Sequence, residues 1–413
     1  MGEEGLAERA LHMLAGGVNS PIRSRMPAGF FAARGEGPYL YDTTGKRYLD
    51  YCLGYGPLIL GHAHPAVADA ICSQAFLGTL FGCTSDREVA YAEEVLRHLP
   101  SHLGMVRCVN SGTEATMAAI RLARGITGRE DIVAFDGSYH GAHDQLLARR
   151  APGEATSPSS RGVCPATVST THLATFNDIE KTADLVRRTR AAAVIAEPVM
   201  GNMGCILPED GFLSELRAVC TEEGALLILD EVITGFRLTP GGAQEHFGVA
   251  ADIATYGKVA GGGLPIGLVA GSREVMEHLS PTGPVYNAGT FNGNPLSMAA
   301  GCAALAELRT HDALARIAAH TKELVSGVSD ILPPDAVVCS CPGMFQVYFG
   351  TSGVHNAEDA RAADGSRYLS FQQALFSEGV FLPPSMHESN FLSAVHDAVD
   401  IEQTIAAMER ALL

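Results

Sequence analysis

The chain has 413 residues, of which 46% are hydrophobic and 18% charged, and its formal net charge at pH 7 is -17. This length and composition predict a folded protein with a large core and two to three domains, and exclude an intrinsically disordered chain. The acidic charge argues against nucleic acid or an anionic membrane as a main partner, and no apolar run approaches the roughly 18 to 20 residues of a membrane span.

The segment 1–60 predicts an N-terminal arm or a small subdomain. A short helical pattern opens the chain, and its acidic start lacks the apolar region of a signal peptide. The stretch 15–23 is rich in Gly, Asn and Pro and predicts a loop. Two strand-like runs, 38–42 and 48–51, flank a predicted hairpin turn at 43–46.

Residues 61–310 predict a large α/β domain, because helical and apolar strand-like segments alternate along them. Strands are expected at 105–110, 131–136, 191–198 and 225–230, and helices at 113–125 and 211–223. Continuously apolar strands between helices are typical of a mostly parallel sheet that is covered on both faces. Ligands bind beyond the carboxyl ends of such strands, so the polar residues there are the candidate functional groups.

Residues 311–413 predict a smaller α+β domain. Its expected elements are a helix at 312–332, a strand at 344–349, one helix at 360–377, a strand at 380–382 and a closing helix from Val399.

The ten cysteines show no paired CxxC spacing and fall largely in apparent core segments, which indicates buried thiols in a reducing, cytoplasmic compartment. Cys339 and Cys341 share one face of a strand, but two thiols without further ligands more often pack than bind a metal. No metal site is therefore expected.

Lys258 is the first candidate catalytic residue. It lies between small residues and is soon followed by three glycines at 261–263, where the backbone can turn tightly and another group can approach closely. The apolar run 225–232 precedes Lys258 and contains two carboxylates, Asp230 and Glu231. A buried strand there would place these acids close to the lysine. This setting suits a Schiff-base lysine. A surface lysine before a flexible loop is the alternative.

Three further groups at strand ends complete a pattern. Ser111, Gly112 and Thr113 open a helix after a strand and would form an anion site, although an ordinary N-cap explains them equally. Asp230 ends a buried strand and needs a partner, which a protonated ring nitrogen, a salt bridge or a metal would supply. Tyr139 offers an aromatic face for stacking or for core packing. A phosphate cradle, a stacking ring, an acid and a lysine are together what pyridoxal phosphate requires.

Three motifs then resemble those of the class III aminotransferases of fold type I, which use pyridoxal phosphate: 229–237 (LDEVITGFR), 257–267 (GKVAGGGLPIG) and 289–295 (GTFNGNP). Within that family the chain is most similar to the glutamate-1-semialdehyde 2,1-aminomutases, and the similarity runs over nearly its whole length. The segments that carry it are 16–23, 139–144, 198–202, 241–248 and 384–388. The resemblance implies a mostly parallel seven-stranded sheet covered by helices, and a smaller α+β domain built from the N-terminal arm and the C-terminal segment.

The resemblance also implies roles for individual residues. Lys258 would attach the cofactor as a Schiff base and move a proton, and Asp230 would hold the proton of the cofactor ring. The expected phosphate ligands are Ser111, Gly112, Thr113 and, from a neighbouring subunit, Thr290. Tyr139 and Val232 would lie against the two ring faces, with His140 and Asn202 beside the ring. The expected substrate-binding residues are Arg23, which would clamp a carboxylate, together with Ser20, Tyr55 and Glu388.

The implied reaction is an intramolecular amino exchange that converts (S)-4-amino-5-oxopentanoate to 5-aminolevulinate, an isomerase step of tetrapyrrole biosynthesis. The shared site implies a homodimer. A diamine has to stay enclosed during the exchange, and relatives close a loop over it. Here that loop, 147–160, is shorter and has Pro152 where a serine is expected, and Tyr55, Asn287 and Phe291-Asn292 replace the usual pocket residues. A class III aminotransferase acting between an amino acid and another aldehyde or ketone is therefore the alternative activity, whereas a non-catalytic scaffold is disfavoured because both Lys258 and Asp230 are present.

Overall fold

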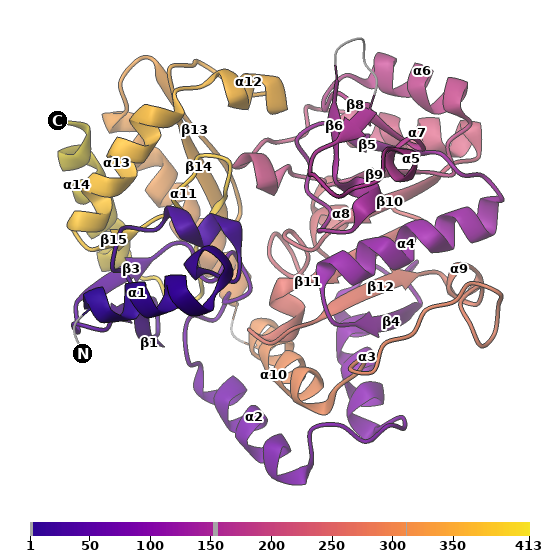
Figure 1. Ribbon diagram of the computed structural model, residues 1–413, viewed down its shortest axis with the longest axis horizontal. Helices are drawn as coiled ribbons and strands as arrows, with labels where there is room; N and C mark the ends of the chain where they lie inside the picture. The colour runs from indigo at the N-terminus through magenta and orange to yellow at the C-terminus, as the bar shows by residue number, and fades with distance from the viewer. Residues whose placement is uncertain (1–2, 152–155, 311) are drawn as a thin grey trace.

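The computed structural model describes residues 3–151, 156–310 and 312–413. Figure 1 shows a larger lobe on the right and a smaller lobe on the left, in which the indigo N-terminal segment and the yellow C-terminal segment lie side by side. The predicted α/β fold class is confirmed.

A seven-stranded sheet forms the centre of the larger lobe. Neighbouring strands run parallel except for β12, which is antiparallel to both β11 and β4. In spatial order the strands are β4 (Met105–Val109), β12 (Gly267–Gly271), β11 (Ile253–Gly257), β10 (Leu226–Asp230), β9 (Ala193–Ala196), β5 (Ile132–Phe135) and β8 (Thr171–Ala174).

Both faces of this sheet are buried, because successive side chains of a strand point to opposite faces. In β10, Leu227 and Leu229 belong to one core cluster and Ile228 to another. Helices α3 (Asp86–His98), α6 (Ile179–Thr189), α7 (Phe212–Glu223) and α10 (Pro295–Thr310) supply the first cluster, and α4 (Gly112–Thr127) and α9 (Arg273–Met276) supply the second. This arrangement explains why the strands are apolar throughout.

Two smaller sheets build the other lobe. β15 (Val380–Phe381) pairs in parallel with β3 (Arg47–Asp50), so the two ends of the chain share one sheet with β1 (Ala32–Glu36) and β2 (Tyr39–Asp42). The second sheet contains β13 (Ala336–Cys341), β14 (Met344–Phe349) and β16 (Asn390–Phe391). Around them lie α1 (Glu3–Met13), α11 (Ala313–Ile331), α12 (Ala357–Ala362), α13 (Gly365–Ser377) and α14 (Ala398–Leu412).

The single helix expected at 360–377 is wrong, because the structure has two helices there. Asp364 interrupts the pattern: its carboxylate accepts hydrogen bonds from the backbone N–H groups of Ser366 and Arg367 at 3.0 Å each. An N-cap of this kind begins a new helix. The expected loop 15–23 contains two short 3-10 turns, η1 (Ala15–Gly17) and η2 (Pro21–Arg25).

The remaining elements lie around the larger lobe. In the segment 147–160, which differs from the aminomutase pattern, β6 (Ala148–Arg150) and β7 (Thr156–Pro158) pair antiparallel. Pro152 lies outside the described residues. The other helices are α2 (Pro65–Leu77), α5 (Pro165–Val168) and α8 (Ala243–Phe247). Among the described residues no helix is long and apolar enough to cross a membrane.

Cys341 packs against Cys205 with the two Sγ atoms 3.9 Å apart. Over the described parts of the chain, no cluster of three or more His, Cys, Asp or Glu side chains could hold a metal ion.

Candidate active site

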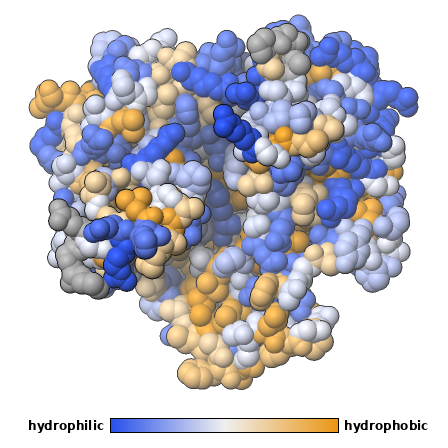
Figure 2. Space-filling model, in the orientation of Figure 1, coloured by the Kyte–Doolittle hydropathy of each residue, from blue (hydrophilic) through white to orange (hydrophobic). Residues whose placement is uncertain are grey.

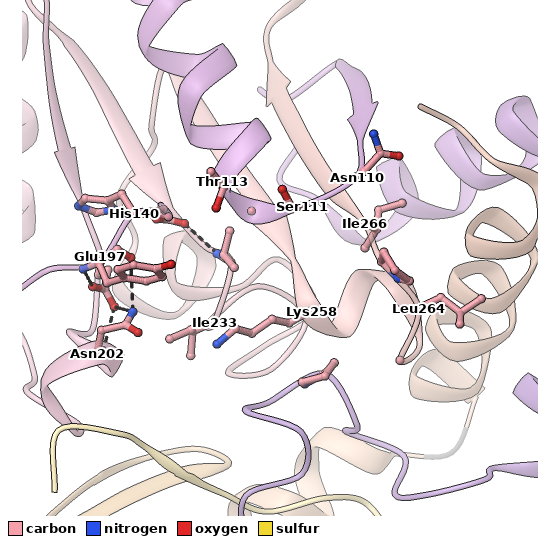
Figure 3. Close-up of a pocket in the computed structure, with 18 residues that line it drawn as sticks. Asn110, Ser111, Thr113, His140, Glu197, Asn202, Ile233, Lys258, Leu264 and Ile266 are labelled. Carbon is pink, nitrogen blue, oxygen red and sulfur yellow. Dashed lines mark hydrogen bonds and ion pairs between the residues drawn. The ribbon is translucent and has the colours of Figure 1, made fainter. Parts of the chain in front are cut away.

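A pocket of about 460 Å³ opens at the carboxyl ends of the central strands. Its volume falls in the range of small-molecule and cofactor sites. Nine of the residues expected to contact a cofactor line it: Ser111, Gly112, Thr113, Tyr139, His140, Asn202, Asp230, Val232 and Lys258. Figure 3 shows the end of α4 on one side of this pocket and the Lys258 side chain extending into it.

Lys258 follows β11 directly and has a left-handed backbone conformation, with φ of +45°. Such a conformation costs free energy in a residue with a side chain and is concentrated at functional sites. The side chain is half-buried and lines the pocket, and burial lowers the pKa of Lys258 to about 8, against the opposing charge of Glu388. About a tenth of the amine is therefore uncharged at pH 7, far more than in an ordinary lysine with a pKa of 10.5, and the uncharged form is the nucleophile.

The residues of the predicted anion site lie at the N-terminus of α4 and line the pocket. Ser111 is the N-cap, and its Oγ accepts a hydrogen bond from the Glu114 N–H at 3.2 Å. The Thr113 hydroxyl accepts from the Ala142 N–H at 3.2 Å, and a Cβ at Gly141 would come within 2.5 Å of that hydroxyl. The N-cap explanation of Ser111 is confirmed. It is compatible with the anion site, which stays a prediction, because the cap lies at the positive end of the helix dipole.

Asp230 lines the pocket and has three protein partners. His140 Nδ1 lies 2.7 Å from Oδ2, and because a carboxylate only accepts, this imidazole nitrogen carries the donated proton. The Thr255 hydroxyl donates to Oδ1 at 3.0 Å, and the Val232 N–H donates to it at 3.2 Å. A carboxylate has about four acceptor positions, so Asp230 can also accept from a ring N–H in the pocket.

Glu197 organises the opposite wall and is a residue that the predicted site set omits. Its carboxylate accepts from the backbone N–H groups of Tyr139 and Gly201 at 2.9 Å each, and from the Asn202 amide nitrogen at 3.0 Å. Burial raises its pKa above the usual carboxyl value. The position of Glu197 directly after an apolar strand indicated a functional residue. Only the fold shows that it joins the segment of Tyr139 to that of Gly201 and Asn202.

The expected substrate-binding residues do not line this pocket. Arg23 and Tyr55 line a neighbouring cavity of about 600 Å³, beside η2, and Ser20 lines neither of these two cavities. Burial raises the pKa of Tyr55. The charges of Cys52 and Glu388 raise it further, and that of Arg23 lowers it. Glu388 is partly buried and electrostatically coupled to Lys258, and burial raises its pKa.

Thr290 is exposed and does not line the pocket of its own chain. Arg25, two residues after the expected carboxylate clamp, is the arginine whose charge lowers the pKa of Glu388. The apolar residues Pro57, Ile233, Leu264, Pro265 and Ile266 also line the pocket; they come from loops, and no local sequence pattern places them there.

Comparison with known proteins agrees with this geometry. The family model described as "Aminotransferase class-III" matches residues 21–392. The chain is 47% identical to the glutamate-1-semialdehyde 2,1-aminomutase of Methanocaldococcus jannaschii, over 98% of this chain and 96% of the relative, and 47% identical to that of Methanothermobacter thermautotrophicus, over 100% and 99%.

Two solved structures resemble the fold closely. An omega-transaminase from Sphaerobacter thermophilus has a TM-score of 0.93 at 33% identity, covering 99% of this chain and 97% of its own. A glutamate-1-semialdehyde aminomutase from Pseudomonas aeruginosa has a TM-score of 0.90 at 27% identity, covering 99% and 94%; a variant of it was crystallised in complex with PMP. With its motifs, its fold and the family match over residues 21–392 in agreement, the chain belongs to the class-III aminotransferases.

Proposed function

We propose that this chain is a pyridoxal-phosphate-dependent aminomutase that converts (S)-4-amino-5-oxopentanoate to 5-aminolevulinate by intramolecular amino exchange. The observation that carries the proposal is the convergence of a lysine of lowered pKa, a buried aspartate and a helix N-terminus on one pocket. Relatives bearing the aminomutase name at 45–47% identity over nearly the full length support the choice of reaction.

The residues present fit the cofactor. The N-terminus of α4 with Ser111 and Thr113 suits its phosphate, and Asp230 suits its ring nitrogen, with the ring between Tyr139 and Val232. The close approach of Gly141 to Thr113 leaves this part of the wall without a side chain that would fill the cradle. When bound, pyridoxal phosphate carries the amino group and withdraws electrons from the carbon that exchanges a proton.

Lys258 supplies the amine that attaches the cofactor and then holds and transfers a proton at its Nζ atom. His140 keeps Asp230 oriented through the hydrogen bond from Nδ1, and the buried Asp230 carboxylate would hold the proton of the ring nitrogen. Glu197 fixes the Tyr139 and Asn202 segments so that the ring faces a rigid wall.

The substrate is a small amino-acid-like molecule with a carboxylate, and we assign Arg23 as its clamp. Tyr55 lines the cavity that holds Arg23, and the charge of Glu388 acts on both Tyr55 and Lys258. A substrate whose carboxylate binds Arg23 would extend past Tyr55 toward the amine of Lys258. The amino group of the substrate would then meet Glu388, and Ser20 would border the entrance.

An intermolecular aminotransferase is the second candidate activity. The short β6–β7 hairpin stands where relatives close a longer loop, and a diamine that escapes would leave the cofactor without its amino group. The similarity to the omega-transaminase structure supports the same alternative.

One incubation separates the two activities. The purified protein, loaded with pyridoxamine phosphate, is supplied with (S)-4-amino-5-oxopentanoate and no amino donor, and 5-aminolevulinate is measured. The aminomutase predicts many turnovers per site. If product stops at about one equivalent and an added amino acid restores cycling, the chain is an aminotransferase.

We also propose that the protein is a homodimer with shared active sites. Figure 2 shows apolar residues gathered on the protrusion at the bottom, where Figure 1 places α2. Phe76 is 94% exposed on α2, and Leu77, Phe81 and Phe291 are exposed as well. Apolar patches of this kind mark interfaces. Thr290 is exposed next to the exposed Phe291 in the sequence, and an exposed threonine is accessible to the pocket of a partner subunit as a phosphate ligand. The cysteine usage suits work in the cytoplasm.

A further inference from the structure

Arg237 is completely buried and binds only neutral groups. Its Nε donates to the Ile233 carbonyl at 3.3 Å, its Nη1 to the Gly343 carbonyl at 3.5 Å, and its Nη2 to the Gly56 carbonyl. Within residues 3–151, 156–310 and 312–413, no carboxylate pairs with it. Burial lowers the pKa of Arg237 to about 10, so the guanidinium still carries its charge at neutral pH.

A buried charge without an acidic partner is costly, and arginine is rarely buried unless paired. The three carbonyls satisfy part of its hydrogen-bonding capacity but cancel none of its charge. The uncompensated positive charge of Arg237 therefore influences the ionisation of neighbouring groups.

The nearby group is Lys258, which lies beside the same aromatic ring as Arg237. Arg237 Cζ lies 4.6 Å from the centroid of the Phe391 ring, and Lys258 Nζ lies 5.9 Å from the same centroid. Gly56, whose carbonyl binds Arg237, has φ of +108°, and a Cβ there would stand 3.2 Å from Phe391 and 3.4 Å from Lys258 Cδ. These four residues thus form one packed unit.

The unit joins segments that are distant in the sequence. Gly56 belongs to the loop after β3, Gly343 to the turn between β13 and β14, and Phe391 to β16, whereas Arg237 follows the strand that ends at Asp230. The guanidinium is therefore the point at which three segments of the smaller lobe are held against the strand ends of the larger one.

We propose that Arg237 is a positioning residue for Lys258: it holds Gly56 and Phe391 against the lysine side chain and places a positive charge that opposes protonation of the amine. The inference rests on the role proposed above for Lys258. Burial is the largest influence on the pKa of that amine; Arg237 lowers it further, and Glu388, Glu197 and Asp230 oppose the lowering.

The test uses the full-length protein without cofactor, so that it does not depend on the reaction. Trace labelling with acetic anhydride between pH 6 and 11, followed by mass spectrometry, gives the midpoint at which the Lys258 amine becomes reactive, with the exposed Lys322 as the internal reference. Arg237→Met should move the midpoint upward by about half a unit to one unit. This is less than the roughly 1–3 units that an adjacent charge causes, because the guanidinium and the amine meet only through the Phe391 ring. Arg237→Lys keeps the positive charge, so its Lys258 midpoint should lie closer to that of the unsubstituted protein.

The matched control is Arg188→Met, which removes an arginine from the exposed surface of α6 and should leave the midpoint unchanged. If Arg237→Met does not fold, Arg237→Gln retains amide donors for the carbonyls without the charge and should show the same upward shift. A folded Met or Gln variant with an unchanged Lys258 midpoint, and only a lower melting temperature, overturns the proposal. Failure of the 5-aminolevulinate assay with a normal midpoint shift would instead reject the proposed reaction and leave this inference standing.

Discussion

Lys258 follows the carboxyl end of β11, has a left-handed backbone conformation, and carries an amine whose pKa is lowered by burial. We expect Lys258→Ala to lower turnover by at least about 10²–10⁴-fold, the range for loss of a positioned acid–base group, and to abolish the visible absorbance of the bound cofactor. Absorbance spectra and steady-state rates measure both effects. Lys322→Ala, at an exposed position, is the control. An unchanged spectrum in Lys258→Ala would contradict the assignment.

The pH at which the cofactor attaches follows from the same residue. Only the uncharged amine reacts with an aldehyde, and the pKa of Lys258 is lowered from 10.5 to about 8. The second-order rate of pyridoxal phosphate attachment should therefore fall about tenfold per pH unit well below 8 and level off above it. Stopped-flow absorbance across this range measures the rate. If the midpoint of this rate–pH profile lies near pH 10, burial does not lower the pKa of the Lys258 amine.

At the scale of elements, the antiparallel strand β12 packs closely against Ser111, the first residue of the proposed phosphate site. Gly267 begins that strand, and a Cβ there would overlap the carbonyl group of Ser111, coming within 2.6 Å of its carbon. Gly267→Ala should displace the start of α4 at a cost of about 1–3 kcal/mol, and so weaken cofactor affinity roughly 5- to 150-fold while the core strands still form.

Titration of the Gly267→Ala variant with pyridoxal phosphate gives the affinity. Gly104→Ala is the matched control: Gly104 directly precedes β4, and its nearest neighbour to an added Cβ lies at 3.9 Å. Equal affinities for the two variants would show that β12 does not hold the cradle in place.

At the scale of the whole molecule, the exposed patch on α2 and the place of Thr290 predict sites that two subunits complete. Lys258→Ala and Thr290→Glu should each be inactive alone, the second because it sets a carboxylate at the phosphate site. Their mixed dimer contains one intact site, so unfolding and refolding an equal mixture should restore about a quarter of the normal activity by random pairing. No recovery in a mixture that is dimeric by analytical ultracentrifugation would reject shared sites.

Much of this protein is determined by its sequence alone. Continuously apolar runs predicted buried parallel strands, because only a sheet covered on both faces removes such runs from water, and Lys258, Asp230 and Ser111 stood at their ends. Strand β12, by contrast, is a five-residue segment with glycine at both ends, and its antiparallel place between β4 and β11 comes from long-range pairing. The break at Asp364 was missed because a capping carboxylate competes with the helical pattern around it.

Only the tertiary structure decided which neighbours surround the amine. Glu197, Arg237 and Phe391 come from segments far apart in the chain, and no local periodicity relates them to Lys258. The same holds for Arg23, which the motif pointed to but which the fold places in an adjoining cavity. Chemical type and strand-end position are local properties of a sequence, whereas burial, charge environment and distance arise when distant segments pack together, and these set the ionisation of a catalytic group.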